Sequence, residues 1–227
     1  MNICWVEDEF MDMNVERAAK LDTATISDAL DRLGIVGQCY QIKPRDSSFR
    51  LAGRAFTIKY GPSQTPSGTV GDFIDDVPEG SVIVLDNGGR DDVTVWGDIL
   101  TEIAHRRKIA GTVIDGICRD VALCMKLGYP VYAKDHWMRT GKDRVQVEGT
   151  NVTVTIGRAR VAPGDLLRGD ADGVLVIPKE HEEKVLAAAE EIEAAEEKIR
   201  GAIRGGMRLD EARKANKYHS LQTREKA

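Results

Sequence analysis

Two short stretches of the sequence carry side chains that could bind a small anion together with a divalent cation. The first stretch contains Asp98, and the second contains Arg119 and Asp120. Two carboxylates can hold a hard ion such as Mg²⁺, directly or through water. Arg119 adds a planar fork of donors that suits a carboxylate or an enolate oxygen. These residue types therefore favour a metal-dependent site that binds a 2-oxo acid.

The same residues also have a purely structural interpretation. An Arg-Asp pair at the start of a helix often provides only a cap and a surface ion pair. Asp98 could likewise be a first-turn acid that interacts favourably with the helix dipole. Residue type alone leaves both interpretations open, because matches of this kind are hypotheses.

The surrounding elements predict that these residues meet at one edge of a parallel sheet. Strands are expected at Ser81–Asp86, Gly111–Asp115 and Pro130–Ala133, and helices at Val95–Arg107 and Arg119–Leu127. Such alternation predicts parallel strands joined by crossover helices. Asp98 would lie in the first turns of one helix, and Arg119 and Asp120 would open the next. Ligands collect at the carboxyl ends of such strands.

The rest of the chain predicts a more antiparallel region. A helix at Thr25–Leu33, capped by Thr25, precedes a strand at Leu51–Tyr60 and a loop at Gly61–Gly68. Short strands separated by turns are expected at Val145–Val147, Asn151–Ile156, Leu166–Arg168 and Val174–Ile177. That pattern is typical of an antiparallel meander or a barrel wall. A long helix at about Lys179–Arg204 follows.

Composition bounds the class of protein. The chain has 227 residues, 42% hydrophobic and 30% charged, with a net charge of -5 and no large basic block. This balance predicts a globular protein and argues against nucleic acid as a partner. The sequence shows no apolar run long enough to span a bilayer, and Met1–Phe10 does not resemble a signal peptide. The cysteines show no paired framework and are expected to be free thiols in the cytoplasm: Cys4, Cys39, Cys118 and Cys124.

The spacing of the candidate residues resembles a family signature. Asp98, twenty intervening residues (Ile99–Cys118) and then Arg119-Asp120 look like the Asp–x20–Arg–Asp signature of the RraA-like family. Further segments are similar to that family, at Ala52–Thr57, Gly111–Gly116, Pro163–Asp165 and Asp170–Pro178. The resemblance implies a layered αββα sandwich around a mixed, barrel-like sheet of the swivelling β/β/α type. It implies a single domain over residues 1–227, with a core at about 20–205, a helical tail at 206–227, and a homotrimer or dimer of trimers.

The resemblance also implies an activity. Enzymes of the family are 4-hydroxy-4-methyl-2-oxoglutarate / 4-carboxy-4-hydroxy-2-oxoadipate aldolases that also decarboxylate oxaloacetate, with Mg²⁺ or Mn²⁺ as the cofactor. By this resemblance, the backbone N–H groups of Gly97, Asp98, Ile99 and Leu100 would bind the substrate carboxylate. Arg119 would bind substrate and stabilise the enolate. Asp120 would ligate the metal, and Asp98 would hold and activate a metal-bound water.

A glutamate in the last helix is a further candidate. Val185, Ala189, Ile192, Ile199 and Ile203 form an apolar stripe at helical spacing, and Glu196 lies inside it. A carboxylate in such a position is costly unless it is paired or binds a cation. In the family, an acid of the C-terminal helix reaches the metal-bound water of a neighbouring subunit, and Glu196 best matches that place. Pairing with an arginine, or a water-filled seam, is the alternative.

Two rival functions remain at this point. One is a non-catalytic regulator of ribonuclease E. In that branch the position of Asp98 is typically Gly and an acid follows a few residues after the Arg-Asp pair, whereas Val121, Ala122 and Leu123 follow here. The other is a lyase or decarboxylase for a different 2-oxo acid. A methyltransferase is disfavoured because the chain has no Gly-x-Gly-x-x-Gly loop. The segment Lys134-Asp135-His136-Trp137 departs from the family pattern and, with the Gly61–Gly68 loop, leaves the substrate open.

Several other residues are expected to be structural. Lys59 should lie on the exposed side of a strand, and Cys118 should pack in the core. His136 is interpreted as a loop histidine that shapes specificity. The three tryptophans, Trp5, Trp96 and Trp137, are expected to be packing residues.

Overall fold

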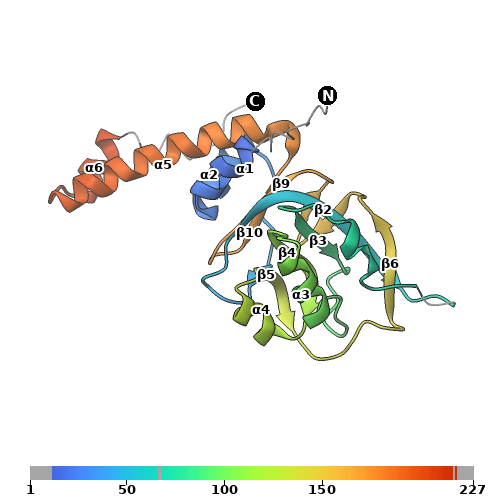
Figure 1. The fold of residues 1–227 in the computed structure, drawn as a ribbon. Helices are drawn as coiled ribbons and strands as arrows, with labels where there is room; N and C mark the ends of the chain where they lie inside the picture. Colours follow the sequence, from blue (N-terminus) through green and yellow to red (C-terminus); the bar gives the residue numbers. More distant parts are fainter. Residues whose placement is uncertain (1–11, 66–67, 217, 219–227) are drawn as a thin grey trace, which may run out of the picture.

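The computed structural model describes residues 12–65, 68–216 and 218, and its centre is a mixed sheet of eight strands (Figure 1). The strand order is β1-β5-β4-β3-β2-β9-β10, and β6 also pairs with β2. The sheet strands are β1 (Lys43–Pro44), β2 (Leu51–Pro62), β3 (Val82–Asp86), β4 (Gly111–Cys118), β5 (Val131–His136), β6 (Val145–Thr150), β9 (Leu166–Gly169) and β10 (Val174–Ile177). A separate hairpin consists of β7 (Val154–Ile156) and β8 (Ala159–Val161).

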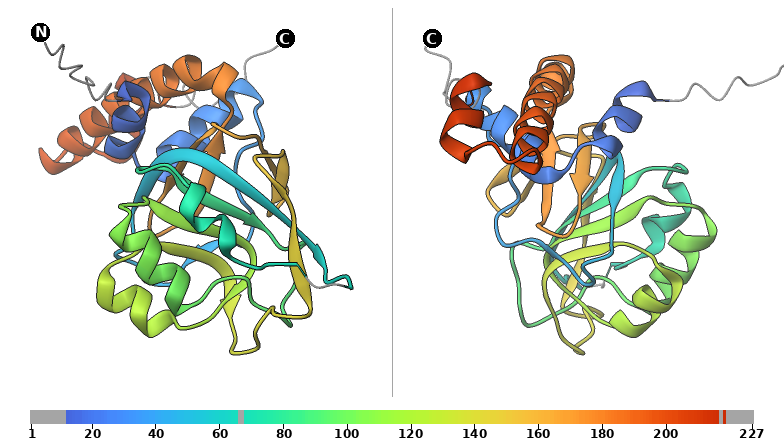
Figure 2. Two further views of the ribbon diagram at one scale, coloured as in Figure 1. Left: turned by 45° about the vertical axis from the view of Figure 1, so that its right-hand side comes forward. Right: turned by 90° about the vertical axis from the view of Figure 1, so that its left-hand side faces the viewer.

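The helices lie on two sides of this sheet (Figure 2). The α-helices are α1 (Met13–Lys20), α2 (Thr23–Leu33), α3 (Asp98–Arg106), α4 (Val121–Leu127), α5 (Glu182–Arg204) and α6 (Leu209–Ala215). Two short 3-10 helices are η1 (Asp72–Asp76) and η2 (Lys179–His181). The result is a mixed α/β fold with a nearly closed, barrel-like sheet, as the sequence predicted.

Four parallel strands form the part of the sheet that carries the candidate residues. β2, β3, β4 and β5 pair in parallel, and α3 and α4 are the crossover helices. All eight residues of β4 are buried, which is why this segment reads as an apolar run. The predicted alternation of strand and helix is therefore confirmed.

A second apolar cluster holds the terminal helices against β9 and β10. Leu166, Leu175 and Ile177 of these strands pack with Leu30 of α2 and Ile192 of α5. All five side chains are buried, and α5 then continues past the sheet, with its C-terminal half and α6 projecting away from the body (Figures 1 and 2). The antiparallel pairs β2–β9 and β9–β10 confirm the predicted antiparallel region.

Several predicted boundaries need correction. α2 begins at Thr23 rather than Thr25, because the Asp22 carboxylate caps it by accepting the Thr25 N–H at 2.7 Å. β6 runs from Val145 through Thr150, three residues beyond the predicted strand end at Val147. Helix α1 and the short strands β1 and β8 were not predicted. α1 has only eight residues and one buried residue, Ala18, so it is shorter than the window over which a helical pattern can be recognised.

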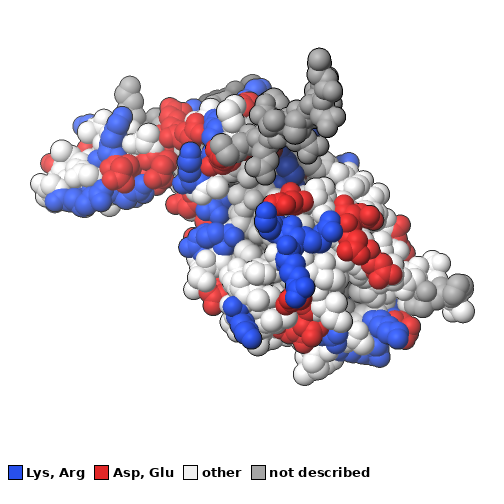
Figure 3. All heavy atoms as spheres, viewed as in Figure 1, with Lys and Arg blue, Asp and Glu red and all other residues white. Residues whose placement is uncertain are grey.

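The surface carries charges of both signs. On the face shown in Figure 3, basic and acidic side chains are intermixed, and α5 and α6 carry both. Among the described residues no helix is both long and apolar enough to cross a membrane. The three cysteines that the structure describes, Cys39, Cys118 and Cys124, are buried free thiols, and Cys4 lies outside the described residues.

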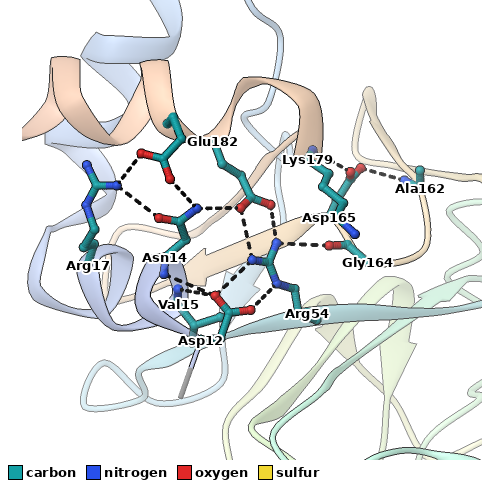
Figure 4. Close-up of polar contacts among 11 residues, drawn as sticks. Asp12, Asn14, Val15, Arg17, Arg54, Ala162, Gly164, Asp165, Lys179 and Glu182 are labelled. Atoms are coloured by element: carbon teal, nitrogen blue, oxygen red, sulfur yellow. Dashed lines mark hydrogen bonds and ion pairs between the residues drawn. The ribbon is translucent and has the colours of Figure 1, made fainter. Parts of the chain in front are cut away.

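An arginine on β2 connects helices α1 and α5 to the sheet (Figure 4). Arg54 forms ion pairs with Asp12, which caps α1, and with Glu182, which opens α5. Only 6% of the Glu182 side chain is exposed, so its charge depends on this partner. Asn14 donates a second bond to Glu182 at 3.0 Å. The hydrogen bond from Arg54 also holds the pKa of Asp12 below its usual range.

Replacing Arg54 should destabilise the fold strongly. Arg54→Ala leaves the buried Glu182 without its cation and should cost about 3 kcal/mol in the free energy of unfolding. Adding Glu182→Gln removes the unpaired charge and should restore part of that loss. Arg106→Ala, which breaks an exposed pair with Glu102, is the matched control and should cost less than about 0.5 kcal/mol. Urea unfolding followed by circular dichroism measures all three, and equal losses for Arg54→Ala and Arg106→Ala would contradict this assignment.

Candidate active site

The candidate site lies where β4 and the β3–α3 connection end side by side. The N–H of Arg119, directly after β4, donates to the carbonyl of Trp96 at 3.0 Å. Trp96 itself is buried, donates from Nε1 to Thr101 Oγ1 at 2.9 Å, and stacks on Tyr129. These contacts fix the start of α3 against the residue that leads into α4.

A glycine allows the candidate side chains to come together. A Cβ atom on Gly97 would lie 2.8 Å from Asp120 Oδ2 and 3.1 Å from Arg119 Nε. The N–H of Asp98 donates to Asp120 Oδ2 at 3.1 Å, and Arg119 Nε lies 3.3 Å from the same oxygen. The fold therefore brings together Asp98, Arg119 and Asp120, although Asp98 and Asp120 are 22 positions apart in the sequence.

Arg119 and Asp120 do not open α4, contrary to the sequence prediction. β4 continues to Cys118, α4 begins at Val121, and Asp120 adopts a left-handed backbone with φ 57° and ψ 36°. Asp tolerates this conformation better than most residues with a side chain. The turn places the Asp120 carboxylate at the N-terminus of α3, where the helix dipole favours a negative charge.

Asp98 and Arg119, but not Asp120, line an inner cavity of about 230 Å³. Its lining also includes Gly97, Ile99 and Leu100 of the α3 start, Val70–Gly71 and Thr140–Lys142. The cavity therefore combines helix N-terminal amides with Arg119 and Lys142, which suits a small anion. Carboxylates already accept two of these amides, because Asp98 Oδ1 accepts the Ile99 N–H at 2.8 Å and Asp120 accepts that of Asp98.

The donor set fits a hydrated divalent ion better than one fully enclosed by protein. The Asp120 side chain is 38% exposed and accepts the N–H of Asp98, the first residue of α3. Within the described ranges no three His, Cys, Asp or Glu side chains gather in a metal-binding group. Mg²⁺ keeps several waters and often takes only one or two protein carboxylates. Asp120 and Asp98 therefore fit an ion whose remaining ligands are water and substrate oxygens.

A second depression, which the sequence did not predict, is also lined by Arg119. This outer hollow has a volume of about 430 Å³ and is lined by Arg119, Asp120, Val121, His136, Trp137 and Met138. Trp137, expected to be a packing residue, packs only in part, since it is 42% exposed. Trp96 does pack as expected, and Trp5 lies outside the described residues.

The segment that departs from the family pattern divides into two parts. Lys134 pairs with the buried Asp115 at 2.7 Å, and Asp135 lies 3.6 Å from Arg45. These two residues fix the end of β5. His136, which ends that strand rather than lying in a loop, and Trp137 instead face the outer hollow.

Glu196 lies away from this site within one chain. It lines neither the inner cavity nor the outer hollow, and it occupies the part of α5 that projects from the body (Figure 1). Its carboxylate pairs with Arg200 at 3.1 Å, which was the alternative left open by the sequence. The apolar stripe also ends early, because Ile203 is 42% exposed.

Two other candidates are confirmed as structural. Cys118 is fully buried, and burial raises the pKa of its thiol to about 12, so it is not a poised nucleophile. Lys59 is exposed on β2. The Gly61–Gly68 loop begins later than predicted, because β2 extends through Pro62, and residues 66–67 lie outside the described part of the chain.

Two substitutions at Asp120 separate the effect of its left-handed backbone on stability from the effect of its charge. Asp120→Asn should leave the free energy of unfolding nearly unchanged, because Asn also tolerates the left-handed region and the lost ion pair is half exposed. Asp120→Ala should cost about 1 kcal/mol more. Urea unfolding of the two variants tests this, and equal stability of the Asn and Ala variants would contradict the assigned backbone strain.

Comparison with known proteins places this geometry in a family. The family model RraA-like (Aldolase/RraA) matches residues 23–176. Protein DlpA of Legionella pneumophila is 38% identical over 92% of this chain, and the chain spans only 34% of that protein's length. A Halalkalibacterium halodurans protein named "Putative 4-hydroxy-4-methyl-2-oxoglutarate aldolase" is 33% identical over 81% of this chain and 85% of its own.

A solved structure agrees with the assignment. The crystal structure of an uncharacterized protein from Pseudomonas syringae pv. tomato superposes with a TM-score of 0.84 at 38% identity, covering 89% of this chain and 98% of that one. Sequence match and fold together show that the chain belongs to the RraA-like family.

Proposed function

We propose that this protein is a divalent-metal-dependent aldolase that cleaves a 4-hydroxy-2-oxo acid to pyruvate and a second carbonyl product. The observation that carries the proposal is the contact of Arg119 and Asp120 with the Gly97-Asp98 helix start at the edge of the inner cavity. The name of the Halalkalibacterium relative supports an aldolase, and hence a lyase. Oxaloacetate decarboxylation is proposed as a side activity because it forms the same pyruvate enolate.

The inner cavity suits the oxo-acid end of such a substrate. Amides of Gly97–Leu100 would bind its carboxylate, displacing the protein carboxylates that accept two of them. Arg119 would bind an oxygen of the substrate beside them. A cavity of about 230 Å³ accommodates a group of this size.

The chemistry of cleavage assigns a role to each residue. Asp98, through an ordered water, would accept the proton of the 4-hydroxyl group. The bond between carbons 3 and 4 then breaks, its electron pair forms the enolate of pyruvate, and carbon 4 leaves as a carbonyl. Arg119 would stabilise the negative charge on the enolate oxygen. Protonation of carbon 3 completes pyruvate.

The proposal includes Mg²⁺ or Mn²⁺ held by Asp120, with Asp98 acting through water. When bound, such an ion would supply Lewis-acid polarisation of the 2-oxo group. Asp120 would have to exchange its contacts with Arg119 and the Asp98 amide for the ion, and its 38% exposure leaves room for this.

The proposal also includes a second copy of the chain, as a homotrimer or dimer of trimers. Because the projecting half of α5 lies away from its own site, Glu196 could reach the metal-bound water only in a neighbouring subunit. Arg200 would then have to release it or accompany it.

A binding protein without catalysis is the second candidate, since the matching family model covers both aldolases and RraA. The presence of Asp98 at the site favours the enzyme, as does the lack of an acid in Val121–Leu123, directly after Asp120. A lyase for another 2-oxo acid would use the same residues and differ only in the remainder of the substrate.

Pyruvate release tests the function directly. Oxaloacetate and a panel of 4-hydroxy-2-oxo acids should yield pyruvate with Mg²⁺ or Mn²⁺, measured with a coupled dehydrogenase, and EDTA should abolish it. Arg119→Lys should lower kcat by about a hundredfold, because a single ammonium cannot replace the planar fork. If no substrate gives metal-dependent pyruvate, the protein is not an aldolase of this kind; decarboxylation without aldol cleavage would favour the other lyase.

Glu196→Gln should lower turnover without unfolding the protein. Glu197→Gln, which also removes a contact with Arg200, is the matched control and should keep full activity. If Glu196 acts in a neighbouring subunit, oligomers assembled from a mixture of Arg119→Lys and Glu196→Gln chains should regain activity, because some sites then combine an intact Arg119 with an intact Glu196. Unchanged kinetics in Glu196→Gln would remove this residue from the site.

A further inference from the structure

The outer hollow lies beside the proposed reaction centre but differs from the inner cavity in character. The two depressions share Arg119. Both linings include apolar side chains. The inner cavity adds Lys142 and helix amides, whereas the outer hollow adds Trp137 and Met138. Among the described residues, Arg119 is the only lysine or arginine lining the outer hollow.

The backbone fixes these apolar side chains in place. His136 pairs in register with Cys118, and the N–H of Trp137 donates to the Cys118 carbonyl at 2.9 Å, one residue before Arg119. On the far side of Met138, the carbonyl of Arg139 accepts the N–H of Thr94 at 3.0 Å. The segment is therefore anchored at both ends, and Trp137 is held next to Arg119.

The same segment continues into the inner cavity. Residues Thr140–Lys142, which follow directly, line the inner cavity together with the α3 N-terminus. A molecule held by its anionic end in the inner cavity would therefore extend past Arg119 along one continuous stretch of chain. Its other end would reach a surface where Trp137 is 42% and Met138 is 70% exposed.

We propose that the outer hollow is the subsite for the substituent on carbon 4 of the substrate, and that it selects an uncharged aromatic group over a carboxylate. The inference rests on the proposed aldolase function and names its substrate class: 4-aryl-4-hydroxy-2-oxo acids, cleaved to pyruvate and an aryl aldehyde. A ring would cover Trp137 and Met138 and gain stacking and sulfur–aromatic contacts. A volume of about 430 Å³ is ample, since about 150 Å³ suffices for benzene.

A second carboxylate is the disfavoured occupant. The proposed function uses Arg119 and the ion held by Asp120 for the oxo-acid end, and no other lysine or arginine of the described residues lines the hollow. His136 could contribute a hydrogen bond, but its Nδ1 already lies 3.2 Å from the Asp135 carboxylate. The charge distribution therefore disfavours a carboxylate substituent here.

The test compares kcat/KM for three compounds: 4-hydroxy-2-oxo-4-phenylbutanoate, 4-hydroxy-4-methyl-2-oxoglutarate and oxaloacetate. The wild-type enzyme should prefer the phenyl compound over the methyl-carboxylate compound. Trp137→Ala should lower kcat/KM for the phenyl compound about tenfold and leave oxaloacetate unaffected, whereas Trp137→Phe should retain most of the preference. Met125→Ala, which removes an exposed methionine of α4 that lines neither depression, should change nothing.

Binding separates this inference from the proposed function. 2-Oxo-4-phenylbutanoate, which carries the ring on carbon 4 but lacks the 4-hydroxyl group, should bind more tightly than 2-oxobutanoate in calorimetry, and Trp137→Ala should abolish the difference. If no compound is cleaved but this binding difference holds, the aldolase proposal fails and the subsite stands. A preference for the carboxylate compound, or an equal loss for all compounds in Trp137→Ala, would overturn the subsite. A change in sedimentation coefficient in that variant would also overturn it, since Trp137 would then be a contact between subunits.

Discussion

The candidate site depends on the close approach of Gly97 to Arg119 and Asp120. Gly97 ends the connection from β3, and Arg119 directly follows β4, so the contact joins two neighbouring strand–helix units. Any side chain at position 97 would collide with the Asp120 carboxylate, which lies 2.8 Å from the place of a Cβ atom. The left-handed backbone at Asp120 completes the arrangement by presenting that carboxylate to the Asp98 amide. Two local constraints thus create a compact acidic and basic centre at the edge of a buried parallel sheet.

Much of this arrangement could be predicted from the sequence because burial leaves a clear pattern. β4 is buried throughout, and the strands around it alternate with helices of ordinary length, so the parallel region and the neighbourhood of Asp98 with Arg119 and Asp120 follow. The start of α4 could not be predicted correctly from the sequence, because one residue with a left-handed backbone leaves no periodic pattern. α1 was not predicted because its eight residues are too few for a helical pattern to stand out.

The outer hollow shows the limit of reading residue types alone. Residue type alone predicts that Trp137 is a packing residue, because tryptophans are highly buried on average. The pairing of β5 with β4 instead holds its backbone beside Arg119, and its side chain is partly exposed. Glu196 illustrates the opposite case. Its position in an apolar stripe is unusual for a carboxylate, yet within one chain Arg200 provides the opposite charge. Its proposed catalytic role requires a second copy of the chain.

The central claim is that Asp98, Arg119 and Asp120 bind an enolate-like anion together with a divalent ion. Oxalate resembles the pyruvate enolate, and analogues of a reaction's high-energy species bind more tightly than substrates. Calorimetric titration of the full-length protein with oxalate should show binding in Mg²⁺ that EDTA removes and that folded Asp120→Asn lacks. Equal oxalate binding with and without Mg²⁺, or undiminished Mg²⁺-dependent binding in Asp120→Asn, would contradict the account.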